Sequence, residues 1–143
     1  MCDDVPCEGM TGAELAAARQ LMGLTVAELA DLLGIADHKR IRQWEKGHTN
    51  HGDATPIPPG IATEIHDLLH RHHATTTALA TQAHASDGII YIPRPHTPPH
   101  HNIPASWLLA AAANARATHP DLRIQWTTPT PETPTRKNAR MQG

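Results

Sequence analysis

The segment that most constrains the fold runs from residue 24 to residue 47 and reads LTVAELADLLGIADHKRIRQWEKG. Thr25 is followed three residues later by Glu28, which is the spacing of a capping box at a helix N-terminus. Apolar residues then recur at helical spacing, and Gly34 stands where a left-handed residue can end a helix. The pattern therefore predicts a short helix between Thr25 and Gly34.

A second short helix is expected to begin after Asp37, whose side chain can cap a helix N-terminus, and to end at Gly47. Ile41 and Trp44 lie three residues apart on this helix, so they share one face and should be buried. Two short helices joined by a tight turn, the second of them basic, are typical of a helix-turn-helix. The second helix of such a motif enters the DNA major groove.

Burial of Ile41 and Trp44 would leave the polar side chains of the second helix facing outward. The side chains predicted to read base edges are His38, Lys39, Arg42 and Gln43. Phosphate contacts are predicted at Thr25, at the N-terminus of the first short helix, and at Arg40 and Lys46 on the second. They are also predicted at His48 and Asn50, in the loop after the second helix. The alternative for the helix is a solvated charged face, and the alternative for the loop is an exposed connection without DNA contacts.

The segment resembles the Cro/repressor-like (XRE) family of DNA-binding domains. That family has the pattern L-T-x-x-E-L-A, then G-hydrophobic-S, then I-x-x-W-E-x-G. The first part stands here at residues 24–30 and the last part at residues 41–47. Two features depart from the pattern, because Ala36 replaces the usual serine and one extra residue separates Gly34 from Ile41.

The chain also resembles the anti-CRISPR-associated (Aca) repressors. This closer resemblance rests on residues 10–15 (MTGAEL), on the W-E-x-G ending and on the long helix expected after it. It extends weakly to residues 89–92 and 124–126, which are similar to strands of a small second domain in that family. The resemblance implies a homodimeric repressor of a phage or mobile-element operon, and it points to Lys39, Arg42 and Gln43 for base readout.

A first helix is predicted before this segment. Thr11 and Glu14 have the spacing of a second capping box, and Gly23 can end the helix, which would span residues 11–22.

After the segment, the pattern predicts one long helix that begins at Pro58 or Pro59 and continues to His84. The elements expected after it are a strand at 89–93, an extended loop at 93–101, an alanine-rich helix at 103–117 and a half-buried strand at 122–126.

These elements predict a mainly α fold, with a helix-turn-helix head of four to five helices and a small α+β C-terminal dimerisation layer. We expect a DNA-binding domain at 10–85, the dimerisation segment at 86–127 and a disordered tail at 128–143. Only 3% of the residues are aromatic and Phe is absent, which predicts a thin core that dimerisation would supplement. The predicted dimer contacts are Leu79, Tyr91, Trp107 and Trp126.

The net charge of −2 is not typical of a protein that binds nucleic acid over its whole surface. However, Lys39, Arg40, Arg42 and Lys46 place four of the 12 basic residues in one predicted helix. A local positive ridge on an acidic body suits specific docking with limited non-specific affinity. We therefore expect a homodimeric repressor of an inverted-repeat operator in double-stranded DNA, cytoplasmic and without a membrane segment.

Other classes of function have less support in the sequence. No nucleophile motif, phosphate loop or paired-carboxylate pattern is present, so neither an enzyme nor a cofactor is expected. Among the 12 histidines, His66, His70 and His73 have helical spacing but lack the H-E-x-x-H pattern, and no metal site is predicted. The alternative that stays open is an antitoxin whose residues 88–127 bind a toxin.

Overall fold

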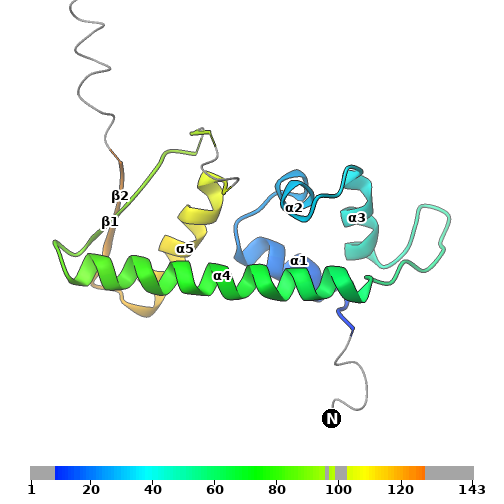
Figure 1. Ribbon diagram of the computed structural model, residues 1–143, viewed down its shortest axis with the longest axis horizontal. Helices are drawn as coiled ribbons and strands as arrows, with labels where there is room; N and C mark the ends of the chain where they lie inside the picture. Colours follow the sequence, from blue (N-terminus) through cyan, green and yellow to red (C-terminus); the bar gives the residue numbers. More distant parts are fainter. Residues whose placement is uncertain (1–8, 96, 99–102, 128–143) are drawn as a thin grey trace, which may run out of the picture.

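The computed structural model describes residues 9–95, 97–98 and 103–127, and the fold in these ranges is mainly helical. Its elements in chain order are α1 (Gly12–Leu21), α2 (Val26–Leu33), α3 (His38–Lys46), α4 (Pro59–His84), β1 (Ile89–Ile92), α5 (Ala105–Thr118) and β2 (Arg123–Trp126). The long helix α4 carries α1, α2 and α3 along one half of its length and α5 with the strands along the other half (Figure 1). No described helix combines the length and apolarity that a membrane crossing requires. The predicted disordered tail lies outside the described residues, as does part of the loop predicted at 93–101.

The capping residues predicted for the first three helices are confirmed. Thr11 and Thr25 each form a complete capping box with the glutamate three residues later. The Asp37 side chain accepts a hydrogen bond from the backbone N–H of Lys39 at 3.0 Å. Glycines with left-handed backbone then end α2 and α3, with φ of 73° at Gly34 and 87° at Gly47. Each helix boundary is therefore determined by residues at the boundary itself.

Helix α5 begins at Ala105, later than the predicted start at Ile103. Pro104 is the N-cap residue, with an extended backbone at φ −69° and ψ 153°. A proline ring disfavours helical backbone at the residue before it, so Ile103 cannot join the helix without strain. The sequence contains this signal, and the prediction did not use it.

The strands β1 and β2 form a two-stranded parallel sheet in which Ile89 pairs with Arg123 and Ile92 pairs with Trp126. Parallel neighbours need a crossover connection, and α5 lies in that connection. Ile90 and Ile92 are buried, whereas Arg123 and Gln125 on the partner strand are exposed. The sheet therefore has one strand largely inside the protein and one at its surface.

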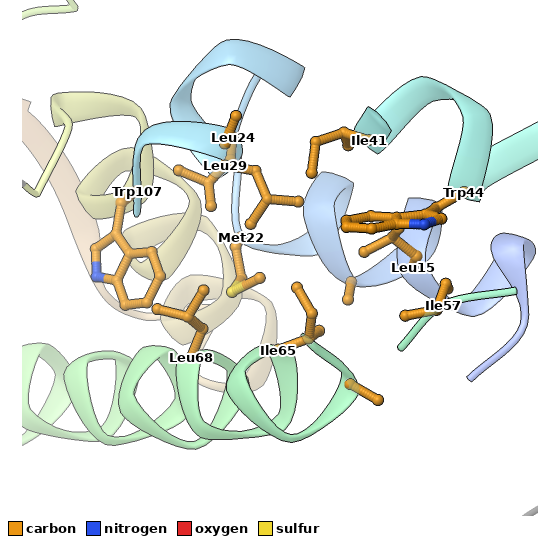
Figure 2. Packing of buried hydrophobic residues seen from close by; sticks show 13 residues of the cluster. Leu15, Met22, Leu24, Leu29, Ile41, Trp44, Ile57, Ile65, Leu68 and Trp107 are labelled. Carbon is orange, nitrogen blue, oxygen red and sulfur yellow. The ribbon is translucent and has the colours of Figure 1, made fainter. Parts of the chain in front are cut away.

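One hydrophobic cluster holds the first four helices together (Figure 2). Its largest fully buried side chains are Leu15 of α1, Met22 directly after α1, Leu29 of α2, Ile41 of α3 and Ile65 of α4. Trp44 and Trp107 lie at opposite ends of this cluster in Figure 2. Trp107 belongs to α5, so a residue far along the chain completes the core around the first helices.

A second cluster joins the distal half of α4 to the strands and α5. Its members are mostly small: Ala80, Ala83, Ile90, Ile92, Ala112, Ala115 and Leu122. Alanines let two helices approach closely but bury little apolar area each. Leu79, a predicted dimer contact, is half-buried against this cluster of its own chain. The distal half of α4 thus has an intrachain partner.

Of the three aromatic residues predicted as dimer contacts, Trp107 is buried in its own chain, apart from Tyr91 and Trp126. Trp107 is only 4% exposed and packs in the first cluster, while Tyr91 and Trp126 are 49% and 38% exposed. Tyr91 also precedes the residue that pairs with Trp126, and successive strand residues point to opposite faces. Tyr91 and Trp126 therefore belong to opposite faces of the sheet.

Candidate nucleic-acid interface

The candidate site is built on α2, α3 and the turn at 34–37 between them. Gly34 has the left-handed backbone that the turn needs, and the Ile35 N–H donates back to the Ala30 carbonyl at 2.8 Å. Asp37 then caps α3 through the Lys39 N–H. These local bonds fix where α3 begins and therefore which of its residues can face outward.

The inner face of α3 is anchored as the sequence predicted. Ile41 is fully buried and Trp44 is 6% exposed, both in the first hydrophobic cluster. The Thr55 hydroxyl also donates to the Gln43 carbonyl at 3.0 Å, which ties the loop after α3 to the last turn of the helix. Helix α3 is thus held along one face and at its C-terminal end.

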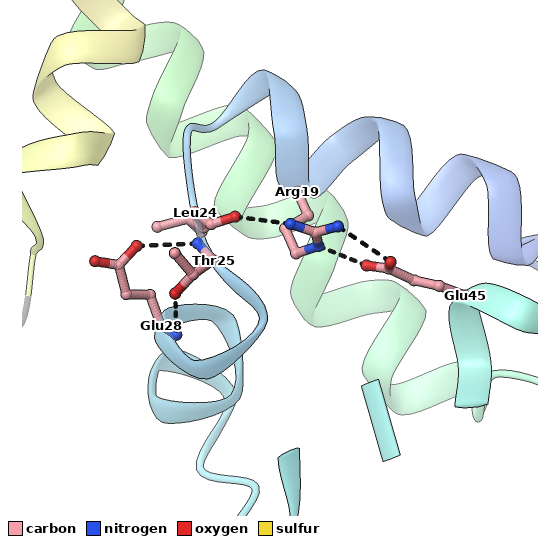
Figure 3. A network of polar contacts seen from close by, with 5 residues as sticks. All are labelled: Arg19, Leu24, Thr25, Glu28 and Glu45. Atoms are coloured by element: carbon pink, nitrogen blue, oxygen red, sulfur yellow. Dashed lines mark hydrogen bonds and ion pairs between the residues drawn. The ribbon is translucent and has the colours of Figure 1, made fainter. Parts of the chain in front are cut away.

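An ion pair that the sequence did not reveal fixes α3 against α1 (Figure 3). Arg19 donates from Nε to Glu45 Oε2 at 2.6 Å and from its NH2 group to Oε1 at 3.1 Å. Its NH1 group donates to the Leu24 carbonyl at 3.1 Å. The hydrogen bonds to Glu45 raise the pKa of the Arg19 guanidinium above its ordinary value, although burial opposes the shift. The one available signal was Arg19 itself, because it is the first base of the chain in a stretch otherwise rich in acids.

The outer face of α3 carries the cationic side chains. Lys39, Arg40, Arg42 and Lys46 are all exposed. Lys39, Arg42 and Lys46 are three and four residues apart, so they form one stripe on the helix. Among the described residues, no hydrogen bond or ion pair involves the side chain of Lys39, Arg40 or Arg42. These cations are therefore open to an anion from outside the chain.

The other two predicted base-reading residues are less exposed. His38 and Gln43 are half-buried, and His38 Nε2 lies 3.9 Å from Asp31 Oδ1 on α2. A carboxylate beside His38 disfavours a close approach of phosphate at that position. The stripe of Lys39 and Arg42 is thus better exposed for contact than His38 or Gln43.

The loop after α3 has its own hydrogen-bonded structure. His48 and Ala54 form an antiparallel bridge, and the Thr49 hydroxyl accepts hydrogen bonds from the N–H groups of His51 and Asp53 at 3.2 and 3.1 Å. Figure 1 shows this loop extending beyond the C-terminal end of α3. The bonds within the loop hold its exposed polar residues next to the helix.

Two residues predicted to contact phosphate meet in this loop. The Lys46 Nζ donates to Asn50 Oδ1 at 3.4 Å, and both side chains are exposed. His48 is also exposed, with Nδ1 2.9 Å from the Thr49 carbonyl. Lys46, His48 and Asn50 therefore lie together at the C-terminal end of α3.

Thr25 is less available than the sequence suggested. Its hydroxyl accepts from the Glu28 N–H, and its own N–H donates to Glu28 Oε1, each at 3.0 Å (Figure 3). Glu28 Oε1 also accepts from the Ser106 hydroxyl of α5 at 3.0 Å. The first turn of α2 would have to bind phosphate through its remaining N–H groups, next to a carboxylate that opposes an anion.

Tyr91 and Trp126, two of the predicted dimer contacts, each contact a charged side chain of their own chain. Tyr91 donates its hydroxyl to Asp87 Oδ2 at 3.0 Å, and Arg94 lies over the Trp126 ring at 5.6 Å from its centroid. Hydrogen bonds from the Ile89 N–H and the Tyr91 hydroxyl lower the pKa of the Asp87 carboxyl. The hydrogen bond between Tyr91 and Asp87 also raises the pKa of the Tyr91 hydroxyl. Both aromatic rings remain substantially exposed.

The histidines of the described ranges do not converge on a metal site. In these ranges no three His, Cys, Asp or Glu residues are grouped closely enough to hold an ion. His84 Nε2 lies 3.2 Å from Asp121 Oδ2, and the His119 ring packs edge-on against the His84 ring at a centroid distance of 5.0 Å.

Comparison with known proteins adds no assignment to this geometry. No model of a protein family matches the chain, and no curated protein matches it either. The argument for function therefore depends on the residues and contacts described above.

Proposed function

We propose that this protein is a sequence-specific DNA-binding repressor in which α2 and α3 form a helix-turn-helix. The observation that carries the proposal is the cationic stripe of Lys39, Arg42 and Lys46 on a helix whose opposite face is anchored by Ile41 and Trp44. A rigid helix with exposed cations on its outer face has the form of a recognition helix that enters the major groove. Under this proposal, the protein has no enzymatic activity and is located in the bacterial cytoplasm.

Within this proposal, some residues on and after α3 contact base edges and others contact phosphates. Arg42 can donate two hydrogen bonds to guanine O6 and N7, and Lys39 can donate to the same acceptors. Lys46, Asn50 and His48 at the far end of α3 are suited to phosphate oxygens. The half-buried Gln43 and His38 would contribute at the margin of the groove.

We further propose that the repressor acts as a homodimer on an inverted repeat. In the part of the chain that the structure describes, no third strand covers the two-stranded sheet, and the exposed Trp126 and Tyr91 lie on its opposite faces. Open strand edges and exposed aromatics are features that a second chain commonly covers. Two-fold symmetry would set two copies of α3 one DNA turn, about 34–36 Å, apart.

A second candidate function uses the exposed surface around Trp126. Leu109, Ile124 and Trp126 line an open hollow of about 480 Å³ together with Arg94 and Gln125. An antitoxin with a DNA-binding head could bind its toxin there, instead of a second copy of itself. The two candidates share the α3 interface and differ in which protein covers the strands.

The experiment that tests the main proposal is selection from a random-sequence DNA library with the full-length protein. We expect enrichment of one inverted repeat, with half-sites one helical turn apart. The double variant Lys39→Ala/Arg42→Ala should abolish the enrichment, whereas Arg71→Ala, which replaces an exposed arginine on α4, should retain it. Failure to enrich any sequence, or equal enrichment with the double variant, would overturn the proposal.

The oligomeric state then separates the two candidates. Light scattering of the protein alone and on the selected DNA should give a dimer if a second copy covers the strands. A chain that stays monomeric in both measurements would contradict the homodimer and favour the antitoxin.

A further inference from the structure

A cavity of about 260 Å³ lies where the two halves of the molecule meet. Its walls come from three helices: Leu32 of α2, Leu68 and Arg71 of α4, and Trp107 of α5, with Pro104 before α5 completing one side. The lining is mostly apolar, and Arg71 is its only charged residue. Ligand pockets typically measure about 300–1,000 Å³, so this one suits a compact molecule.

Trp107 forms part of the cavity wall and carries a buried polar atom. Its indole Nε1 is buried and has no hydrogen-bond partner among the described residues. A buried donor without an acceptor costs free energy, and native proteins seldom leave one unpaired. Trp107 is held in place, because the His72 Nε2–H donates to its backbone carbonyl at 3.1 Å and the two rings pack edge-on.

Arg71 supplies the charge of the cavity lining. Its side chain is exposed, and no carboxylate of the described ranges lies within ion-pair distance of it. A guanidinium beside an apolar chamber attracts an anion whose apolar part can enter the chamber. An aromatic or short branched carboxylate has both parts, and its oxygens could accept hydrogen bonds from the Arg71 guanidinium.

We propose that this cavity is a binding site for a small apolar carboxylate, with Arg71 as its anion partner and the Trp107 side chain as part of its apolar wall. The site itself does not depend on the proposed DNA binding. Its consequence for regulation does, because Leu32 belongs to α2 and the Ser106 hydroxyl of α5 bonds to Glu28 of the same helix. A ligand between α2, α4 and α5 would bias how the proposed DNA-binding helices sit against the C-terminal half.

The test uses benzoate as the probe and the full-length, ¹⁵N-labelled protein. The chain has three tryptophans, so its ¹H–¹⁵N correlation spectrum contains three indole N–H signals. The signal that is missing in Trp107→Phe belongs to Trp107. We expect benzoate to move the Trp107 signal saturably, with a Kd on the order of 1 mM. The signals of Trp44 and Trp126 should stay in place. A non-saturating shift, or an equal shift of all three signals, would overturn the site.

Two variants test the two halves of the proposal separately. Arg71→Met keeps the aliphatic stem and removes the charge, so it should weaken benzoate binding about tenfold. Ala74→Leu fills the cavity from α4 and should abolish binding. The matched controls are Arg123→Met and Ala78→Leu, because both residues are exposed and neither lines the cavity. Unchanged affinity in Arg71→Met would overturn the anion assignment, and unchanged affinity in Ala74→Leu would overturn the location.

A neutral probe tests the class of ligand. Benzyl alcohol has the same ring without the negative charge and should bind about tenfold more weakly than benzoate. Equal affinity for the two probes would contradict a carboxylate site. None of these titrations contains DNA, so their failure leaves the proposed repressor function untouched, and a failed DNA selection leaves this site untouched.

Discussion

Arg19 of α1 and Glu45 of α3 form a two-pronged ion pair across 26 residues of sequence. Both side chains are largely buried, with 17% and 15% exposed. The apolar contacts of Ile41 and Trp44 already restrain the rotation of α3 about its own axis. The ion pair restrains this rotation further. The orientation of the cationic stripe therefore depends on residues that never face outward.

Replacement of Arg19 by Ala should destabilise the fold by about 2 kcal/mol, because it leaves the Glu45 carboxylate partly buried without its partner. Urea unfolding followed by circular dichroism measures this loss. The exposed Arg123→Ala is the control and should change the midpoint little. If Arg19→Ala unfolds at the same urea concentration as the unaltered chain, the pair does not hold α3.

Arg42→Ala should cost about 1–3 kcal/mol of binding free energy on the selected operator and should relax the base preference at one position. The physical reason is the loss of a two-pronged contact to a base edge, which other sequences lack. Fluorescence anisotropy on the operator and on random duplex DNA measures both affinities. Equal losses on the two DNAs would reassign Arg42 to phosphate.

Lys46→Ala should weaken binding to all sequences alike and reduce the slope of log K against log salt by about 1. Lys46 is at the end of α3 and beside Asn50, where a phosphate contact releases counterions without reading a base. Anisotropy titrations at several salt concentrations give the slope. An unchanged slope would show that Lys46 is a solvated helix-end charge.

The parts of the fold that the sequence predicted are those encoded by neighbouring residues. The capping boxes at Thr11 and Thr25 and the glycine ends at Gly34 and Gly47 involve partners within a few residues, so their spacing was sufficient. The exposure of Lys39 and Arg42 followed in the same way, because Ile41 and Trp44 fix the opposite face.

The parts that escaped prediction involve distant partners. Nothing in helical periodicity says that Arg19 will meet Glu45, or that Ser106 will bond to Glu28 across 78 residues. The same limit explains Trp107, since the sequence predicted it as a dimer contact and not as a member of the cluster around the first helices. The half-burial of His38 likewise depends on α2, which carries Asp31 beside it.

Stability should fall as the pH decreases below 6.5, with His72 as one identifiable cause. His72 is buried, and desolvation lowers its pKa from the ordinary value of 6.5, although its bond to the Trp107 carbonyl opposes the shift. The unfolded chain therefore takes up a proton at a pH where the folded chain does not, and the free energy of unfolding decreases as the pH falls.

The variant His72→Gln isolates this contribution among the 12 histidines. Glutamine can still donate to the Trp107 carbonyl but does not titrate. Urea unfolding at pH values on both sides of 6.5 should give a shallower pH dependence for the variant, by at most about 1.4 kcal/mol per pH unit. Parallel curves for the two proteins would exclude His72 as a cause.

A fragment that ends at residue 85 should fold less stably than the chain to residue 127. The cut removes Trp107 and leaves Leu68 and Met22 with one side of their cluster open to water. Loss of a large buried aromatic side chain typically costs about 3–5 kcal/mol. Urea unfolding of the fragments 1–85 and 1–127 measures the difference, and 1–127 against the full chain is the control. Equal midpoints for the two fragments would show that the first four helices form an independent domain and that α5 only rests against it.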